Sequence, residues 1–119
     1  MSTSDFESRL QLLHERYTAS LVHKRAALAD AWQAFAANPR DRALRLELSM
    51  QLHRLSGSAG AYGYEAIGMA ASEADGVVGE HGGIADFDRA QLDRCGNLVL
   101  AVLRALERAE SGTRPPEAP

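Results

Sequence analysis

Apolar residues recur at steps of three and four along most of this chain, and this spacing constrains its fold more than any other feature. Such spacing places side chains on one face of an α-helix. No segment shows the apolar–polar alternation of a strand, and the abundant alanine, leucine, arginine and glutamate favour helix. The sequence therefore predicts an all-α fold. The stripe of the first segment consists of Phe6, Leu10, Leu13, Tyr17, Leu21, Leu28, Trp32 and Phe35.

The first helical segment is expected over about 5–37. Ser4 is a candidate N-cap, with Glu7 three residues later completing a capping box. We expect a break or bend near 21–23, which would give a short helix followed by a longer one. Asn38-Pro39 ends the segment, because proline disfavours helix in the residue before it.

Three further helices are expected, from about Asp41 to Gly63, over about 64–79, and from 86 or 88 to 110. Asp88 and Gln91 form a second possible capping box. The glycines between 76 and 83 indicate a helix end followed by a loop. The predicted inner stripes comprise Leu44, Leu48, Leu52, Leu55, Ala59 and Tyr62; Ile67, Ala70, Ala71 and Ala74; and Leu92, Cys95, Val99, Val102, Leu106 and Ala109.

Amphipathic helices joined by short loops pack best as an antiparallel four-helix bundle. The expected fold is such a bundle, with an additional N-terminal helix that caps or extends it. One domain is expected over 1–110, because 119 residues suffice for a single core. The stretch 111–119 contains three prolines and no apolar anchor, so we expect a disordered tail there.

Composition narrows the classes of function. The net charge of −3, with basic residues scattered among acids, argues against nucleic-acid binding. The single Cys95 allows no disulfide within the chain and fits a reducing cytoplasm. No signal peptide and no apolar run of about 18 residues are found, so we expect a cytoplasmic protein with no membrane partner.

The segment from Leu52 to Gly63 singles out one residue, His53. Glycine in a helix interior costs about 1 kcal/mol relative to alanine, yet glycines follow this histidine one and two turns later. His53 lies off the predicted buried stripe, so its face should point to solvent. The other residues of that face are Leu46, Ser49, Met50, Ser56, Gly57 and Gly60.

This face suits a phosphoryl acceptor. A neutral imidazole is a nucleophile that forms covalent intermediates near neutral pH. Phosphoryl transfer needs in-line approach and little other chemistry from the nucleophile's own protein. Gly57 and Gly60 would clear the way for a partner's active site. The alternative interpretation is that these two glycines allow close helix packing.

The run His53-Arg54-Leu55-Ser56-Gly57-Ser58-Ala59, with Gly63 ten residues after the histidine, resembles the signature of histidine-containing phosphotransfer (HPt) domains. The family pattern is His-x-Leu-Lys-Gly-Ser-Ala, then Gly, then a spaced Leu, Ala and Leu-Glu. Ile67, Ala71 and Ala74-Asp75 occupy the later positions, so the motif covers about 23 residues.

The resemblance implies a four-helix bundle with an exposed phosphoacceptor, His53. The phosphoryl group would pass from an aspartate of one response-regulator receiver domain to His53 and then to another receiver. A hybrid histidine kinase would be a further partner. Leu46, Ser49, Met50, Arg54, Ser56, Gly57 and Gly60 would bind these partners. The chain would be a monomeric carrier and not an enzyme, without a cofactor or metal, and Mg²⁺ would belong to the receivers.

Two positions depart from the family pattern. Ser56 stands where the family often has a lysine that helps to neutralise the phosphoryl group, so Arg54 or a partner would supply that charge. Asp75 stands where relatives tend to carry Gln or Glu, which can approach the histidine from the neighbouring helix. Whether the shorter Asp75 reaches His53 is left open by the sequence.

The remaining candidates have structural interpretations. His14, His23 and His81 have no spacing that makes a zinc site with His53, and Cys95 and Trp32 are expected in the core. Ser58 would bond the carbonyl of Arg54 or serve as a small contact residue. Two other functions stay open: a helical adaptor that binds receivers or kinases through the same face without being phosphorylated, and a cofactor- or metal-binding bundle.

Overall fold

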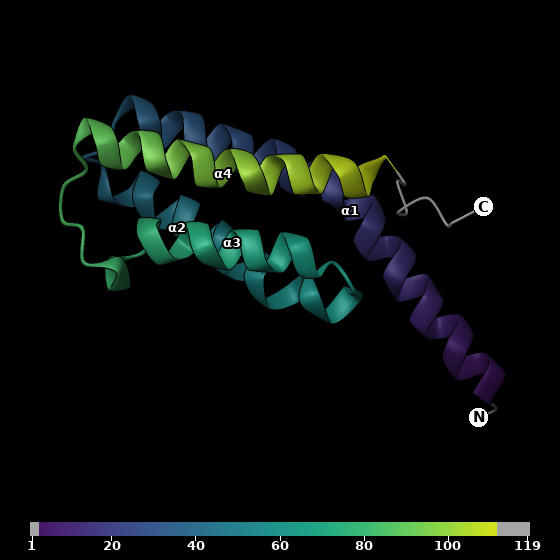
Figure 1. The fold of residues 1–119 in the computed structure, drawn as a ribbon. Coiled ribbons are helices and arrows are strands. Elements are labelled where there is room, and N and C mark those ends of the chain that lie inside the picture. The colour runs from purple at the N-terminus through teal and green to yellow at the C-terminus, as the bar shows by residue number, and fades with distance from the viewer. Residues whose placement is uncertain (1–2, 112–119) are drawn as a thin grey trace, which may run out of the picture.

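The computed structural model describes residues 3–111, and within this range the chain is helical without strands (Figure 1). The predicted tail beyond Ser111 lies outside the described residues. The elements are α1 (Thr3–Ala37), α2 (Arg42–Ser58), α3 (Glu65–Val78) and α4 (Arg89–Glu110), with the short 3₁₀ helices η1 (Gly60–Tyr62) and η2 (Glu80–Gly82).

The α-helices form a bundle in which each packs against two others. α2 lies against α1 and α3, and α4 lies against α1 and α3 (Figure 1). The space between them is filled by one apolar core, to which every α-helix contributes. The largest fully buried side chains are Phe35, Leu21, Leu28, Leu48, Leu52, Ile67 and Leu106.

α1 is one continuous helix, so the predicted break near Leu21–His23 and the separate N-terminal helix are wrong. The predicted alternative, a bend, agrees with the change in direction of α1 where its N-terminal part leaves the bundle (Figure 1). The stretch from Thr3 to Ala37 contains neither glycine nor proline, the residues that usually interrupt a helix. Ser4, predicted as an N-cap, lies inside the helix.

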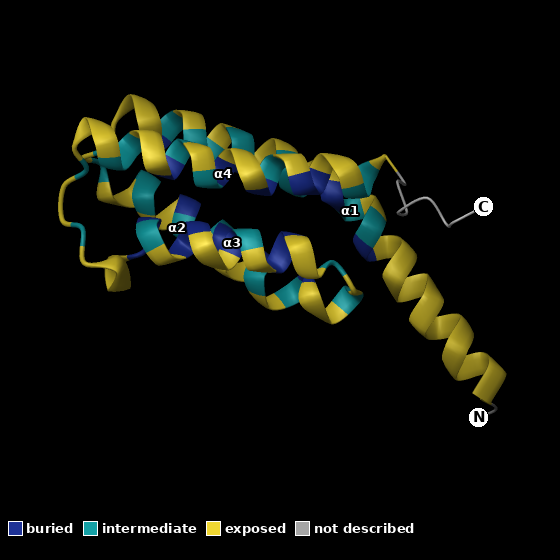
Figure 2. Cartoon of the chain, viewed as in Figure 1, coloured by how far each residue is buried: buried dark blue, intermediate teal, exposed yellow. Residues whose placement is uncertain are grey.

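The N-terminal part of α1 projects beyond the bundle, and its residues from Thr3 to Arg16 are exposed (Figure 2). Phe6, Leu10 and Leu13 were predicted to continue the buried stripe, but they are among the exposed large apolar residues. No other described helix extends far enough to cover them (Figure 1). Burial on α1 therefore begins at Tyr17.

The other helix boundaries agree with the sequence. Asp41 caps α2, its carboxylate accepting hydrogen bonds from the backbone N–H groups of Ala43 (2.9 Å) and Leu44 (3.1 Å). The capping box of Asp88 and Gln91 is present at the start of α4. The predicted inner stripes of α2, α3 and α4 are buried or half-buried.

The connection from α2 to α3 is compact because one glycine takes a left-handed conformation and another allows close contact. Gly63 has φ 87°, which favours glycine. A Cβ on Gly68 would lie 3.5 Å from the Ser56 carbonyl oxygen, so α3 packs closely against the end of α2.

Ser58 has a different partner from the one predicted. Its hydroxyl is 2.7 Å from that of Tyr17, and so bonds across to α1 and not to the carbonyl of Arg54. The Tyr17 ring stacks on Tyr62, with centroids 4.2 Å apart. Burial raises the pKa of Tyr17.

Within the described range, no helix has the length and apolar character needed to cross a membrane.

Candidate functional site

The face of α2 that carries His53 is exposed, as its spacing predicts. The His53 side chain is 80% exposed. Leu46 and Met50, on the preceding turns, are 57% and 39% exposed, and Arg54, Gly57 and Gly60 are also exposed. Ser49 and Ser56 are half-buried at the edge of this face. The exposure of these residues agrees with the predicted face of α2 as far as Gly57, whereas Gly60 lies in η1, beyond the end of α2.

The glycines on this face do not serve close packing. A Cβ built on Gly57 or on Gly60 would meet no atom within 4 Å. Gly68 on α3 is the glycine that allows close approach of the two helices. The alternative interpretation of Gly57 and Gly60 as packing glycines is therefore wrong, and their effect is to leave open space beside His53.

Asp75 reaches the histidine in spite of its short side chain. Its carboxylate is only 9% exposed, and its Oδ2 lies 3.6 Å from His53 Nδ1. The Ser49 hydroxyl donates a 2.6 Å hydrogen bond to Asp75 Oδ1. The distance to His53 exceeds that of a hydrogen bond, so the contact is electrostatic. α3 brings Asp75 here because its neighbours Ala71, Ala74 and Val78 are buried in the core.

Ser56 brings no charge to the site. Its hydroxyl donates a 2.8 Å hydrogen bond back to the His53 carbonyl oxygen and so serves the backbone of the same helix. Residue 56 therefore provides no positive charge near the imidazole of His53. Arg54, one residue after His53, is exposed and lines the hollow beside it.

A shallow hollow of about 300 Å³ adjoins the imidazole. One of its walls is formed by His81 of η2, whose position in the sequence indicates no role at this site. No spacing rule relates a residue in a loop to one in the middle of a helix, so only the packing of the chain could bring the two histidines together. The lining consists of Ser49, Met50, His53, Arg54, Asp75 and His81.

The other candidates stay apart from this hollow. Cys95 is fully buried, and this burial raises the pKa of its thiol. His14 of α1 stacks on Tyr64, the residue directly before α3, with ring centroids 5.6 Å apart. Residues 3–111 contain no group of three or more histidine, cysteine or acidic side chains placed to hold a metal ion.

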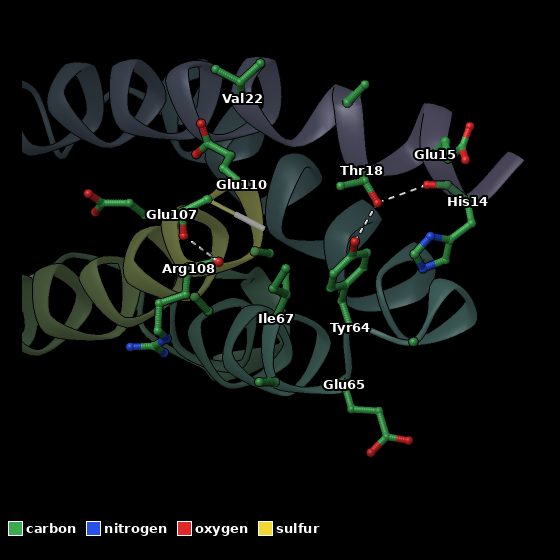
Figure 3. A pocket seen from close by; sticks show the side chains of 16 residues that line it. His14, Glu15, Thr18, Val22, Tyr64, Glu65, Ile67, Glu107, Arg108 and Glu110 are labelled. Carbon is green, nitrogen blue, oxygen red and sulfur yellow. Dashed lines mark hydrogen bonds between the residues drawn. The ribbon is translucent and has the colours of Figure 1, made fainter. Parts of the chain in front are cut away.

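A larger groove of about 1320 Å³ lies away from His53, between α1, the start of α3 and the end of α4 (Figure 3). Several of its polar groups bond to one another or to the helices that form its walls. Thr18 bonds both Tyr64 and the His14 carbonyl, and Glu110 forms an ion pair with Arg25. Size alone does not make this groove a site, and the exposed imidazole with a buried carboxylate beside it lies at the other hollow, around His53.

No protein-family model matches the sequence, and no curated protein matches it. The site must therefore be interpreted from its own geometry: an exposed imidazole, a buried carboxylate at one ring nitrogen, and a surface cleared of side chains.

Proposed function

We propose that this chain is a histidine phosphotransfer carrier. It would accept a phosphoryl group on His53 from an aspartate of one receiver domain and pass it to another receiver. The observation that carries the proposal is the placement of His53. Its side chain is 80% exposed, and its Nδ1 is 3.6 Å from the 9%-exposed carboxylate of Asp75.

Asp75 supports nucleophilic attack by the other ring nitrogen. A carboxylate beside Nδ1 favours the tautomer that carries its proton there, which leaves the lone pair on Nε2. Ser49 holds this carboxylate through the hydrogen bond to Oδ1. Asp75 is therefore a positioning residue, and His53 is the phosphoacceptor.

In the transfer, the Nε2 lone pair attacks the phosphorus of the receiver's aspartyl phosphate. An N–P bond forms, the P–O bond to the aspartate breaks, and the leaving group is a carboxylate. The proton on Nδ1 remains there, so the ring becomes positively charged as the N–P bond forms. The Asp75 carboxylate stabilises this charge.

The docking surface would consist of Leu46, Ser49, Met50, Arg54, Ser56, Gly57 and Gly60. Exposed apolar side chains on the turns before His53, and open space on the turns after it, suit a partner that must bring its own active site close. Mg²⁺ would be held by the receiver, and a hybrid histidine kinase would begin the relay. No nucleic acid or membrane partner is proposed.

The short connections between the helices favour antiparallel neighbours, the arrangement that the resemblance to HPt domains implies. We propose that the chain acts as a monomer in the cytoplasm and that it carries the phosphoryl group without being an enzyme.

Incubation with receiver domains bearing a radioactive aspartyl phosphate tests the proposal. The wild-type chain should become labelled, and His53→Ala should not. His23→Ala is the matched control, because it removes another exposed histidine and should leave labelling intact. If the wild type binds receivers but is never labelled, the chain is an adaptor. Labelling of His53→Ala would overturn the assignment of the phosphoacceptor.

A further inference from the structure

His81 is a second histidine at the proposed site. It lies in η2, immediately after α3, and lines the same hollow as His53, Arg54 and Asp75. The hollow has a volume of about 300 Å³. Because one water occupies about 30 Å³, this hollow has room for a phosphoryl group, which has only a few heavy atoms. A group attached to His53 on this side would therefore have His81 as a neighbour.

The segment that carries His81 is held against α2. The Arg45 guanidinium donates hydrogen bonds to three backbone carbonyl oxygens, those of Val78 (2.7 Å), Gly79 (3.3 Å) and Ala85 (3.3 Å). These carbonyls lie on both sides of η2 in the chain. A planar, multiply bonded guanidinium is a rigid connection, so His81 is kept beside the site.

The imidazole of His81 lies over Gly79. A Cβ at position 79 would be 2.5 Å from His81 Cε1 and 2.8 Å from its Nδ1, which is closer than real Cβ contacts. The backbone of Gly79 does not itself require glycine, because its φ is −66°. The missing side chain therefore leaves space for the ring of His81.

A phosphoryl group in the hollow would add negative charge to a site that already holds a carboxylate and has few cationic groups. Asp75 contributes a carboxylate from α3, and a phosphoryl group on His53 would add up to two further negative charges. Ser56 supplies no cation, and Glu80, next to His81, is paired with Arg42 at 3.0 Å. The cationic groups that line the hollow are Arg54 and, when protonated, His81.

We propose that His81 binds the phosphoryl group of phosphorylated His53, as a cation supplied from the α3–α4 connection in place of the family lysine. This inference rests on the proposed function. The protonated imidazole would donate a hydrogen bond to a phosphoryl oxygen, which stabilises the phosphorylated chain. Because an imidazole is a cation only when it is protonated, this stabilisation should be larger at acidic than at alkaline pH.

The test measures how long His53 stays phosphorylated. The chain is phosphorylated with phosphoramidate, a small donor that needs no receiver, and phosphate at the His53 peptide is followed by mass spectrometry. In hydrolysis, water attacks the phosphorus, the N–P bond breaks, and the ring nitrogen keeps the electron pair. At pH 6, His81→Gln should shorten the half-life about two- to fivefold relative to wild type, the size expected for a partly exposed charge contact.

Three comparisons separate a charge effect from a structural one. The ratio of the wild-type and His81→Gln half-lives should approach one at pH 8.5. His81→Lys should keep the long half-life at both pH values, and Ser56→Lys should restore it in the His81→Gln variant. His23→Gln, which changes an exposed histidine on α1, should leave the half-life unchanged.

The possible failures are distinguishable. If His53 is phosphorylated but His81→Gln decays like wild type at pH 6, the role of His81 is wrong while the phosphotransfer proposal stands. If the ratio of the wild-type half-life to the His81→Gln half-life is the same at pH 6 and pH 8.5, His81 does not act as a cation. If the wild type cannot be phosphorylated at His53 by phosphoramidate or by any receiver, both proposals are wrong.

Discussion

At the scale of single residues, the proposed chemistry depends on unequal surroundings for the two nitrogens of one imidazole. Nδ1 of His53 faces a carboxylate that is almost fully buried and fixed by Ser49. The rest of the ring is exposed. Gly57 and Gly60, which follow it in the chain, have no side chain to obstruct a partner. A nucleophile needs both conditions, because one nitrogen must keep its proton while the other meets the phosphorus.

Asp75→Asn should slow phosphorylation of His53 about tenfold, which corresponds to about 1.4 kcal/mol of lost transition-state stabilisation. The amide keeps the shape and can still accept from Ser49, but it no longer stabilises positive charge on the ring. The rate of labelling by phosphoramidate measures this effect, with circular dichroism as the check on folding. An unchanged rate would exclude Asp75 as a positioning residue.

Gly57→Gln should block receiver-dependent phosphorylation without harming the fold. No atom lies within 4 Å of the added Cβ, and glutamine is the better helix former by up to about 1 kcal/mol. Labelling from a phosphorylated receiver should fall at least tenfold, whereas labelling from phosphoramidate should be unchanged and the melting temperature equal or higher.

Gly76→Gln is the matched control for this variant. Gly76 is an exposed glycine of α3 with equally open surroundings, but it is not one of the residues of the proposed docking surface. It should be labelled like wild type. Equal loss in both variants would mean that Gly57 has no special place in docking.

At the scale of elements, α1 shows that the same apolar spacing can have two outcomes. Tyr17 and Leu21 are buried, while Leu10 and Leu13, which continue the same stripe, are about half exposed. The helix is uninterrupted, so local sequence does not separate the two parts. What separates them is where the neighbouring helices end (Figure 1).

Leu21→Ala should therefore lower the free energy of unfolding by about 2–5 kcal/mol, the usual cost of a large-to-small change in a core. Leu10→Ala on the same helix should change it by no more than about 0.5 kcal/mol. Urea denaturation of the two variants measures the difference. A large loss in Leu10→Ala would show that the N-terminal part of α1 is covered in solution.

At the scale of the whole molecule, burial in the bundle favours the neutral form of two titratable groups, Cys95 and Tyr17. Cys95 and Tyr17 come from different helices and contact the same core, and burial raises the pKa of both. A raised pKa in the folded chain means that the unfolded chain loses its proton first as pH rises. The stability that these groups contribute is thus complete below their usual pKa values and is lost above them.

Stability should accordingly fall as pH rises from about 8 to 10.5, with a limit of about 1.4 kcal/mol per pH unit for each group in its window. Urea denaturation at both pH values measures this fall. Cys95→Ala, although less stable at each pH because of the cavity it leaves, should show a smaller fall than wild type. A fall of the same size in wild type and Cys95→Ala would remove Cys95 as a source of the effect.

Much of this protein was determined by the sequence alone. Apolar spacing predicted the helices, the caps at Asp41 and Asp88 marked two helix starts, and the projection of α2 placed His53 on an exposed face. These features depend on residues within a few turns of one another, so local geometry is sufficient to predict them. Only the tertiary structure decided the length of exposed α1, the partner of Ser58, the reach of Asp75 and the presence of His81 beside His53. Each of these depends on where separate helices pack and end, which is set by the shape of the shared core and not by the spacing within any one segment.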